Sequence, residues 1–140
     1  RRSGWYPEVL AAFDTMNAAS GDQMKQSPLS KVYPNVNWNV LFGKLSELLH
    51  KDYDWTKEVA AIRSPTMLVF ADADAVRLQH IVEFYTLLGG GQRDAGLDGA
   101  QRSANELAIL PGLTHYSIGA APALAQTVSP FLDQAAPREH

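Results

Sequence analysis

The chain has 140 residues, 46% of them hydrophobic, and a formal net charge of -3 at pH 7. That length suits a single domain with one modest core, and the 12 scattered Lys and Arg residues disfavour a nucleic-acid partner. Cysteine is absent, which excludes disulfides and thiolate catalysis and favours a cytoplasmic location. No apolar run approaches the roughly 18 residues that a membrane-spanning helix needs, so no membrane association is expected.

The first 62 residues are predicted to form helices and loops only. Two segments carry apolar residues at helical spacing and indicate amphipathic helices. Proline-containing pairs between these segments, Ser27-Pro28 and Tyr33-Pro34, indicate turns. Asp54 is placed to cap a third short helix that runs through Glu58 towards Ile62. The apolar residues of the two longer helices are Val9, Phe13 and Met16, then Leu41, Leu45, Leu48 and Leu49.

Residues 63–140 are predicted to contain a βαβ unit, which places the chain in the α/β fold class. Residues 66–70 form a short apolar run that predicts a buried parallel strand, and residues 107–110 predict a second strand, closed by Pro111-Gly112. Between them, apolar residues at helical spacing predict a crossover helix that Gly89-Gly90-Gly91 ends. A strand, a helix and a parallel strand in succession are expected to form a right-handed crossover. The apolar helix residues are Leu78, Ile81, Val82, Tyr85 and Leu88.

A C-terminal helix is predicted after the second strand. Pro130 is expected to kink or break this helix, because proline lacks a backbone N–H and clashes with the preceding turn. The apolar residues at helical spacing there are Leu124, Val128, Phe131 and Leu132.

Candidate catalytic residues follow both predicted strands. Asp72 and Asp74 come just after the first strand, and His115 lies just past the second. Ligands of α/β proteins bind at the carboxyl ends of parallel strands, so a carboxylate and an imidazole should meet there. An aspartate beside a histidine fixes the imidazole tautomer and stabilises the imidazolium that forms when the ring accepts a proton, as in a catalytic triad. The alternative is that the aspartates only form turns and that His115 is a capped loop residue.

The residues around both strand ends resemble a known family. Ile62-Arg63-Ser64-Pro65-Thr66-Met67-Leu68-Val69-Phe70-Ala71-Asp72-Ala73-Asp74-Ala75-Val76 resembles the late strand and acid loop of α/β-hydrolases, and Leu110-Pro111-Gly112-Leu113-Thr114-His115 resembles their histidine loop. The resemblance covers residues 60 to 135 and implies that Asp74 is the triad acid and His115 the general base. The same resemblance implies that Asp72 shapes the loop and is not the triad acid. Ala71 stands where the family has glycine.

The same resemblance implies a nucleophile that this sequence does not supply. The α/β-hydrolases carry it in Gly-x-Ser-x-Gly before the acid, and no serine here has glycine at both flanking positions. Ser117 comes closest, but it follows His115 and is expected to open the last helix. Residues 1–62 resemble a helical cap or lid, and residues 63–140 resemble the C-terminal part of the hydrolase core. The chain is therefore expected to begin where a nucleophile half would end.

The resemblance implies a hydrolase that acts on a small-molecule ester or a related bond, without a cofactor or metal. The 140 residues alone are expected to be inactive or nearly so. Two strands leave two open sheet edges, which predicts a partner. That partner is expected to be the missing N-terminal half or another copy of the chain in a homo-oligomer, with no nucleic acid and no membrane involved.

Two other functions stay open. Residues 69–76 also resemble the opening motif of haloacid-dehalogenase-type phosphatases, in which two aspartates act with magnesium; those enzymes need a downstream lysine, and none follows Lys57. The other alternative is a binding or assembly module without catalysis, in which the aspartate and histidine are merely inherited. His50, His80 and His140 lack the spacing that would bring metal ligands onto one face, so no metal site is expected.

Overall fold

The computed structural model describes residues 1–134 as helices and one two-stranded parallel sheet, so the predicted α/β class is confirmed. The chain divides into two compact units, residues 1–54 and 55–140. The composition places the boundary at 62/63, after the short helix α5 (Thr56–Ala60), whereas the structure divides before it. The reason is that α5 packs against α6 (Leu78–Leu87) of the second unit.

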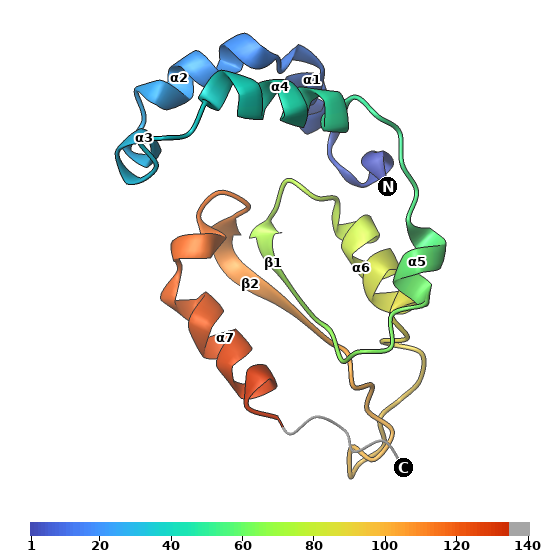
Figure 1. The fold of residues 1–140 in the computed structure, drawn as a ribbon. Helices are drawn as coiled ribbons and strands as arrows, with labels where there is room; N and C mark the ends of the chain where they lie inside the picture. The colour runs from blue at the N-terminus through green and yellow to red at the C-terminus, as the bar shows by residue number, and fades with distance from the viewer. Residues whose placement is uncertain (135–140) are drawn as a thin grey trace. The chain divides into compact units, whose positions relative to one another are not determined.

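The first unit consists of short helices and loops (Figure 1). Its two longer helices confirm the helical periodicity of the sequence. The turn predicted at Ser27-Pro28 is confirmed at Ser27, which lies in a bend between two short helices, but Pro28 already starts the second of them: proline is well suited to a first helical position, where no N–H is needed. The helices are α1 (Pro7–Thr15), α2 (Gly21–Lys25), α3 (Pro28–Val32) and α4 (Trp38–Leu49), with 3-10 turns at Arg2–Gly4 and Ala18–Ser20.

Helix α4 is the centre of the first unit. Its N-terminus is capped by Asn37, whose side-chain Oδ1 accepts a hydrogen bond from the Val40 backbone N–H at 3.1 Å. Trp38 is buried at the start of α4, and α2 begins directly against its backbone at Gly21. A Cβ on Gly21 would lie 2.5 Å from the Trp38 carbonyl carbon, so only glycine allows this approach.

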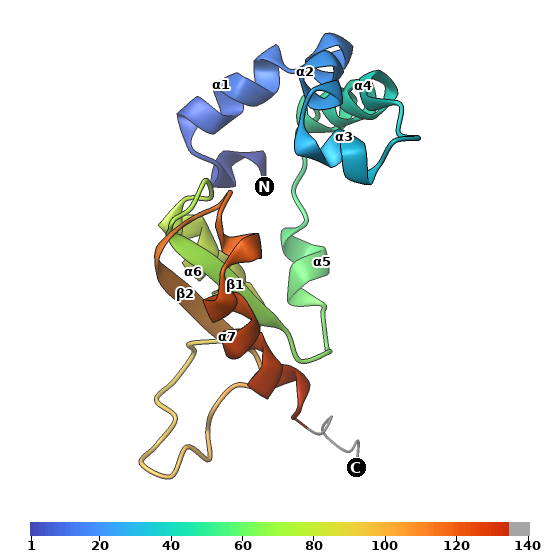
Figure 2. The ribbon, with the colours of Figure 1, turned by 90° about the vertical axis from the view of Figure 1, so that its left-hand side faces the viewer.

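The second unit is a βαβ unit followed by a helix. Strands β1 (Met67–Ala73) and β2 (Glu106–Thr114) pair in parallel, with α6 between them in sequence, as predicted. Helices α6 and α7 (Pro122–Leu132) lie on opposite faces of the sheet (Figures 1 and 2). Helix α7 continues past Pro130 to Leu132, so a break at that proline is not observed. The expected cap at Asp54 is wrong by one position, because Trp55 occupies the N-cap of α5.

The strand pairing contains a bulge that the sequence did not predict. Pairing is regular from Met67 with Glu106 to Ala71 with Leu110, but the next pair is Ala73 with Thr114. Two steps along β1 therefore match four along β2, and the extra residues of β2 are accommodated in the bulge. The prediction that Pro111-Gly112 closes the second strand is wrong for this reason.

Glycines end α6 as predicted. Gly89 has a φ of +89°, which glycine adopts without a steric penalty. Its N–H donates to the Thr86 carbonyl at 2.9 Å, and the Gly90 N–H donates to the Tyr85 carbonyl at 3.0 Å. This pair of bonds is a Schellman motif, which satisfies carbonyls that the helix leaves unpaired.

The core of the second unit is small. Its buried apolar residues come from β1, the turn after it, α6, β2 and α5, and several large apolar side chains stay exposed. A sheet with only two strands covers little of each face, so the core holds few fully buried side chains. Every helix within residues 1–134 is too short or too polar to cross a membrane. The buried residues are Val59, Ala71, Ala75, Ile81, Leu88 and Leu110.

Candidate active site

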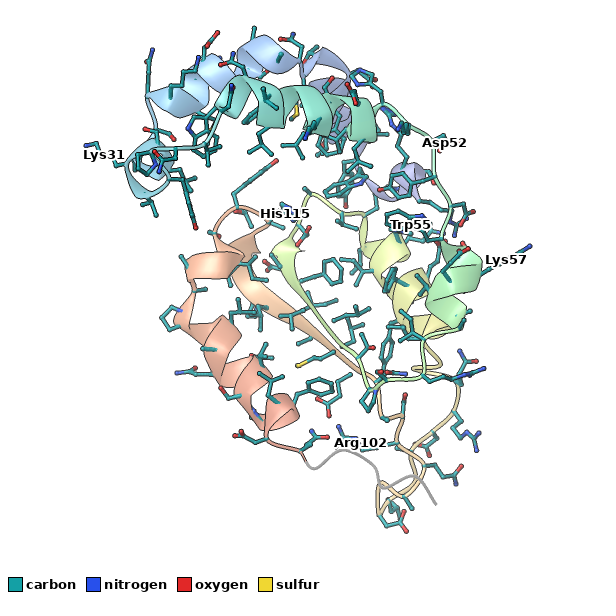
Figure 3. All side chains as sticks on the ribbon, viewed as in Figure 1. Lys31, Asp52, Trp55, Lys57, Arg102 and His115 are labelled. Carbon is teal, nitrogen blue, oxygen red and sulfur yellow. The ribbon has the colours of Figure 1, made fainter. Side chains whose placement is uncertain are left out.

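Asp74 and His115 meet at the carboxyl ends of the two strands. The Nδ1 atom of His115 lies 2.9 Å from Oδ1 of Asp74. Asp74 directly follows β1 and His115 directly follows β2, and the last strand pair joins Ala73 to Thr114. The sheet register therefore brings the two candidate residues together. Figure 3 labels His115 in the turn that follows β2.

Backbone donors fix the Asp74 carboxylate. Its Oδ2 accepts from the Ala71 N–H at 3.1 Å, and its Oδ1 accepts from the Val76 N–H at 3.0 Å as well as facing His115. The Asp74 side chain is only 4% exposed. A carboxylate can only accept hydrogen bonds. The bond to His115 therefore places a proton on Nδ1 of the imidazole.

The His115 ring is more open than its partner. Its side chain is 40% exposed, so a reacting group can approach it. The ring of Tyr116 stands edge-on to the imidazole, with ring centroids 5.6 Å apart, and Tyr116 itself is largely exposed. An exposed aromatic beside an accessible imidazole offers an apolar surface to a small organic ligand.

Asp72 binds the backbone of the histidine loop. Its Oδ2 accepts from the Gly112 N–H at 3.0 Å and its Oδ1 accepts from the Leu113 N–H at 3.2 Å. The Gly112 N–H, together with that of Leu113, holds the pKa of the Asp72 carboxyl below its ordinary value of 3.8. Both oxygens of Asp72 are directed at the loop, in agreement with a role in shaping it.

Ser117 belongs to the turn that follows His115. Its Oγ accepts from the Thr114 N–H at 2.9 Å, and its own N–H donates to the Thr114 hydroxyl at 3.2 Å. Ser117 precedes a 3-10 turn, Ile118–Ala120, and α7 begins at Pro122. The prediction that Ser117 opens the last helix is therefore wrong, and its hydroxyl is part of a local turn rather than a nucleophile elbow.

The other histidines have local contacts. His50 bonds the carbonyls of Ser46 and Asp14, and His80 lies 3.4 Å from a carboxylate oxygen of Glu83 and edge-on to Phe84. His140 lies outside the described residues. Within residues 1–134, no three His, Cys, Asp or Glu side chains are grouped so as to hold a metal ion.

A cavity of about 630 Å³ lies at the opposite end of the sheet. Its wall is formed by the end of α6, the following loop and the start of β2, and it includes Tyr85, Arg102 and Asn105. Figure 3 shows Arg102 at the far end of this unit from His115. With about 3.3 Å per strand residue, the length of β2 separates this cavity from the histidine by on the order of 25 Å. The cavity therefore takes no part in the Asp74–His115 pair.

Two features of the site, and one contact at the opposite end of the sheet, were missed from the sequence. The bulge left no signal beyond Pro111-Gly112, which was interpreted as a strand end. The Val76 N–H bond to Asp74 is an Asx turn, a pattern that aspartate two residues earlier could have indicated. Asn105 joins the start of β1 to the end of α6: its Oδ1 accepts from the Thr66 N–H at 2.8 Å and its Nδ2 donates to the Leu88 carbonyl.

Comparisons of this chain with protein-family models, with curated proteins and with solved structures gave no match.

Proposed function

We propose that this chain supplies the acid and the general base of a hydrolase with a nucleophile–His–Asp triad, acting on a small-molecule ester or a related bond. The observation that carries the proposal is the 2.9 Å contact between His115 Nδ1 and Asp74 Oδ1, made by a carboxylate that two backbone N–H groups hold in place. A loop histidine without a catalytic role does not require a carboxylate partner that two backbone N–H groups already fix in place. The resemblance to α/β-hydrolases at residues 62–76 and 110–115 supports the same chemistry.

The proposed mechanism uses the two ring nitrogens of His115 differently. The Nδ1–H group keeps its proton and donates a hydrogen bond to Asp74, so Nε2 is the atom that accepts the proton of a nucleophilic hydroxyl. The nucleophile oxygen then bonds to the substrate carbonyl carbon, and Asp74 stabilises the imidazolium that has formed. Collapse of the tetrahedral intermediate breaks the ester bond, and Nε2 returns the proton to the departing alcohol. A water molecule then gives a proton to Nε2 and bonds to the acyl carbon. The bond between that carbon and the nucleophile oxygen breaks, which releases the acid, and Nε2 returns its proton to the nucleophile oxygen.

The nucleophile in this proposal comes from outside the 140 residues. No serine of the chain stands in Gly-x-Ser-x-Gly, and the Ser117 hydroxyl is bonded to Thr114. Each strand has one unpaired edge, because β1 and β2 are the only members of the sheet among the described residues. A free strand edge is a template for pairing with another strand, so such an edge could receive the segment that carries the nucleophile. Further strands of the same polypeptide or a separate chain that carries the nucleophile half both satisfy this requirement.

The test is labelling with a fluorophosphonate, which reacts with a serine that a histidine activates. The protein is isolated from its native source under non-denaturing conditions through a tag on this chain, labelled, and the modified residue identified by mass spectrometry. We expect a labelled serine outside residues 1–140, with labelling lost in His115→Ala and retained in His80→Ala. Label on Ser117 would contradict the external nucleophile, and labelling that survives His115→Ala, or no labelling at all, would contradict the proposed function.

A further inference from the structure

The bulge in β2 determines which residue of β2 faces Asp74. After the pair Ala71–Leu110, regular pairing would place Gly112 opposite Ala73. The observed partner of Ala73 is Thr114, two residues further along. Two strand residues span about 7 Å, so regular pairing would carry His115 that far from its observed place relative to Asp74. The 2.9 Å contact between the two side chains exists only in the bulged register.

Little side-chain packing stabilises that bulge. Pro111 and Gly112 are exposed, and a Cβ added to Gly112 would meet no atom within 4 Å. Gly112 has a φ of +71°, a conformation that is reached easily but not imposed by glycine. Pro111 has no N–H, so Gly112 and Leu113 carry the first backbone donors of the bulge. Each of these N–H groups donates to a different carboxylate oxygen of Asp72.

We propose that Asp72 is the positioning residue of the catalytic pair, because its carboxylate selects the bulged register that sets His115 beside Asp74. The inference rests on the proposed function for its catalytic meaning, although its structural content concerns only Asp72, the bulge and His115. A carboxylate suits this task better than any neutral side chain, since its two oxygens accept from two successive N–H groups at once. The lowered pKa of the Asp72 carboxyl has the same cause.

Asp72→Asn is the substitution that isolates this role. Asparagine has nearly the same shape, but it retains one acceptor oxygen and turns an NH2 group towards the second N–H, so one of the two bonds is lost. Asp98→Asn is the matched control, because the Asp98 carboxylate also accepts a backbone N–H, that of Ala100 at 3.1 Å, in an exposed loop away from the pair. Asp72→Glu retains both acceptor oxygens on a longer side chain and serves as a second variant should Asp72→Asn fold poorly.

The measurement is the tautomer of neutral His115, read from the ¹⁵N shifts of its two ring nitrogens in the full 140-residue chain. We expect protonated Nδ1 in the unmodified chain and in Asp98→Asn, a shift towards the Nε2–H form in Asp72→Asn, and an intermediate result in Asp72→Glu. Retained Nδ1 protonation in both Asp72 variants would overturn the inference. A role in folding alone would lower stability without changing the tautomer of the folded chain.

This readout is independent of turnover. Loss of the Nδ1–H form in Asp72→Asn supports the inference even if no hydrolysis is ever detected, in which case only the proposed function fails. Conversely, hydrolysis that depends on His115 but not on Asp72, with an unchanged tautomer, leaves the proposed function standing and removes the positioning role.

Discussion

Asp74 and His115 are 41 positions apart in the sequence, yet Oδ1 of the aspartate lies 2.9 Å from Nδ1 of the histidine. Each follows the last paired residue of its strand, so the parallel sheet brings them together without a long flexible loop. The carboxylate is nearly buried and the imidazole is partly open. This asymmetry is what a base needs when one nitrogen must be fixed and the other must meet a reacting group.

Asp74→Asn should abolish most of the hydrolysis while leaving the fold intact. The amide can donate as well as accept, so it no longer requires the proton on Nδ1, and the wrong tautomer cannot take a proton through Nε2. We expect kcat to fall by roughly 10³ to 10⁴, as in other triads that lose their acid. The comparison is with Asp94→Asn, whose carboxylate accepts from the Gly96 N–H in the loop after α6. Equal rates in the two variants would refute the role of Asp74.

The Asp72 clamp, which is the pair of hydrogen bonds that the Asp72 carboxylate accepts from the Gly112 and Leu113 N–H groups, should persist to a pH below 3.8. Because its folded pKa is lowered, the stabilisation is present above the ordinary value of 3.8 and is lost only as the pH falls through the lower, folded pKa. The amide chemical shifts of Gly112 and Leu113 report this step. The other titratable groups in the adjoining segments are Asp74 and His115. We expect a midpoint below 3.8 and no such step in Asp72→Asn; a midpoint at or above 3.8 would show that the clamp is not formed.

Local amide shifts are preferable to acid unfolding of the whole chain for this purpose. Asp22, in the first unit, also has a lowered pKa, chiefly because Lys25 donates a hydrogen bond to its carboxylate. Acid unfolding would therefore combine both aspartates, whereas the amides of the bulge report Asp72 directly, because they donate to its carboxylate.

Gly112→Ala should destabilise the second unit through the backbone alone. The new methyl group would meet no atom within 4 Å, so the cost is that of an L-residue at a φ of +71°, about 1 to 2 kcal/mol. Gly119→Ala is the control: its added Cβ also meets open space, but its φ is not positive. There we expect no loss, or a gain of roughly 0.5 kcal/mol from the less flexible unfolded chain. Equal free energies of unfolding for the two variants would contradict the bulge geometry.

Gly21→Ala and Gly43→Ala should shift the stability of the first unit in opposite directions. A Cβ on Gly21 would overlap the backbone of Trp38 and Asn39, which cannot yield as a side chain can, so we expect a loss of about 1 to 3 kcal/mol. A Cβ on Gly43 would lie 3.7 Å from the Ala18 Cβ, an ordinary contact, inside α4. Alanine there should raise the free energy of unfolding by roughly 1 kcal/mol, because it has a higher helix propensity than glycine. Chemical denaturation monitored by tryptophan fluorescence measures both.

Periodic patterns in the sequence predicted most of the elements. Apolar residues at helical spacing identified α1, α4 and α6, and the apolar run before Asp72 identified β1, because these patterns depend on which face of an element is buried. The short helices α2 and α3 were missed. Five residues are too few to display a period, and Pro28 indicates a turn and a helix start equally well.

The candidate pair was predictable and its support was not. Asp74 and His115 were identified from their places after two strands, since parallel strands end at one edge. The bulge depends on two hydrogen bonds between Asp72 and residues about 40 positions away, and no local pattern encodes such a pairing. The same is true of Asn105, a polar loop residue whose side chain joins β1 to the end of α6.

The most direct measurement of the central claim is hydrolysis of an activated aryl ester by the protein isolated intact from its native source, compared with its His115→Ala and His80→Ala variants, the recombinant 140-residue chain and a blank. The His115–Asp74 base predicts turnover by the isolated protein that is lost in His115→Ala and kept in His80→Ala, with the 140-residue chain equal to the blank. Turnover that persists in His115→Ala, or its absence from the isolated protein, would contradict the assignment of His115 as the general base.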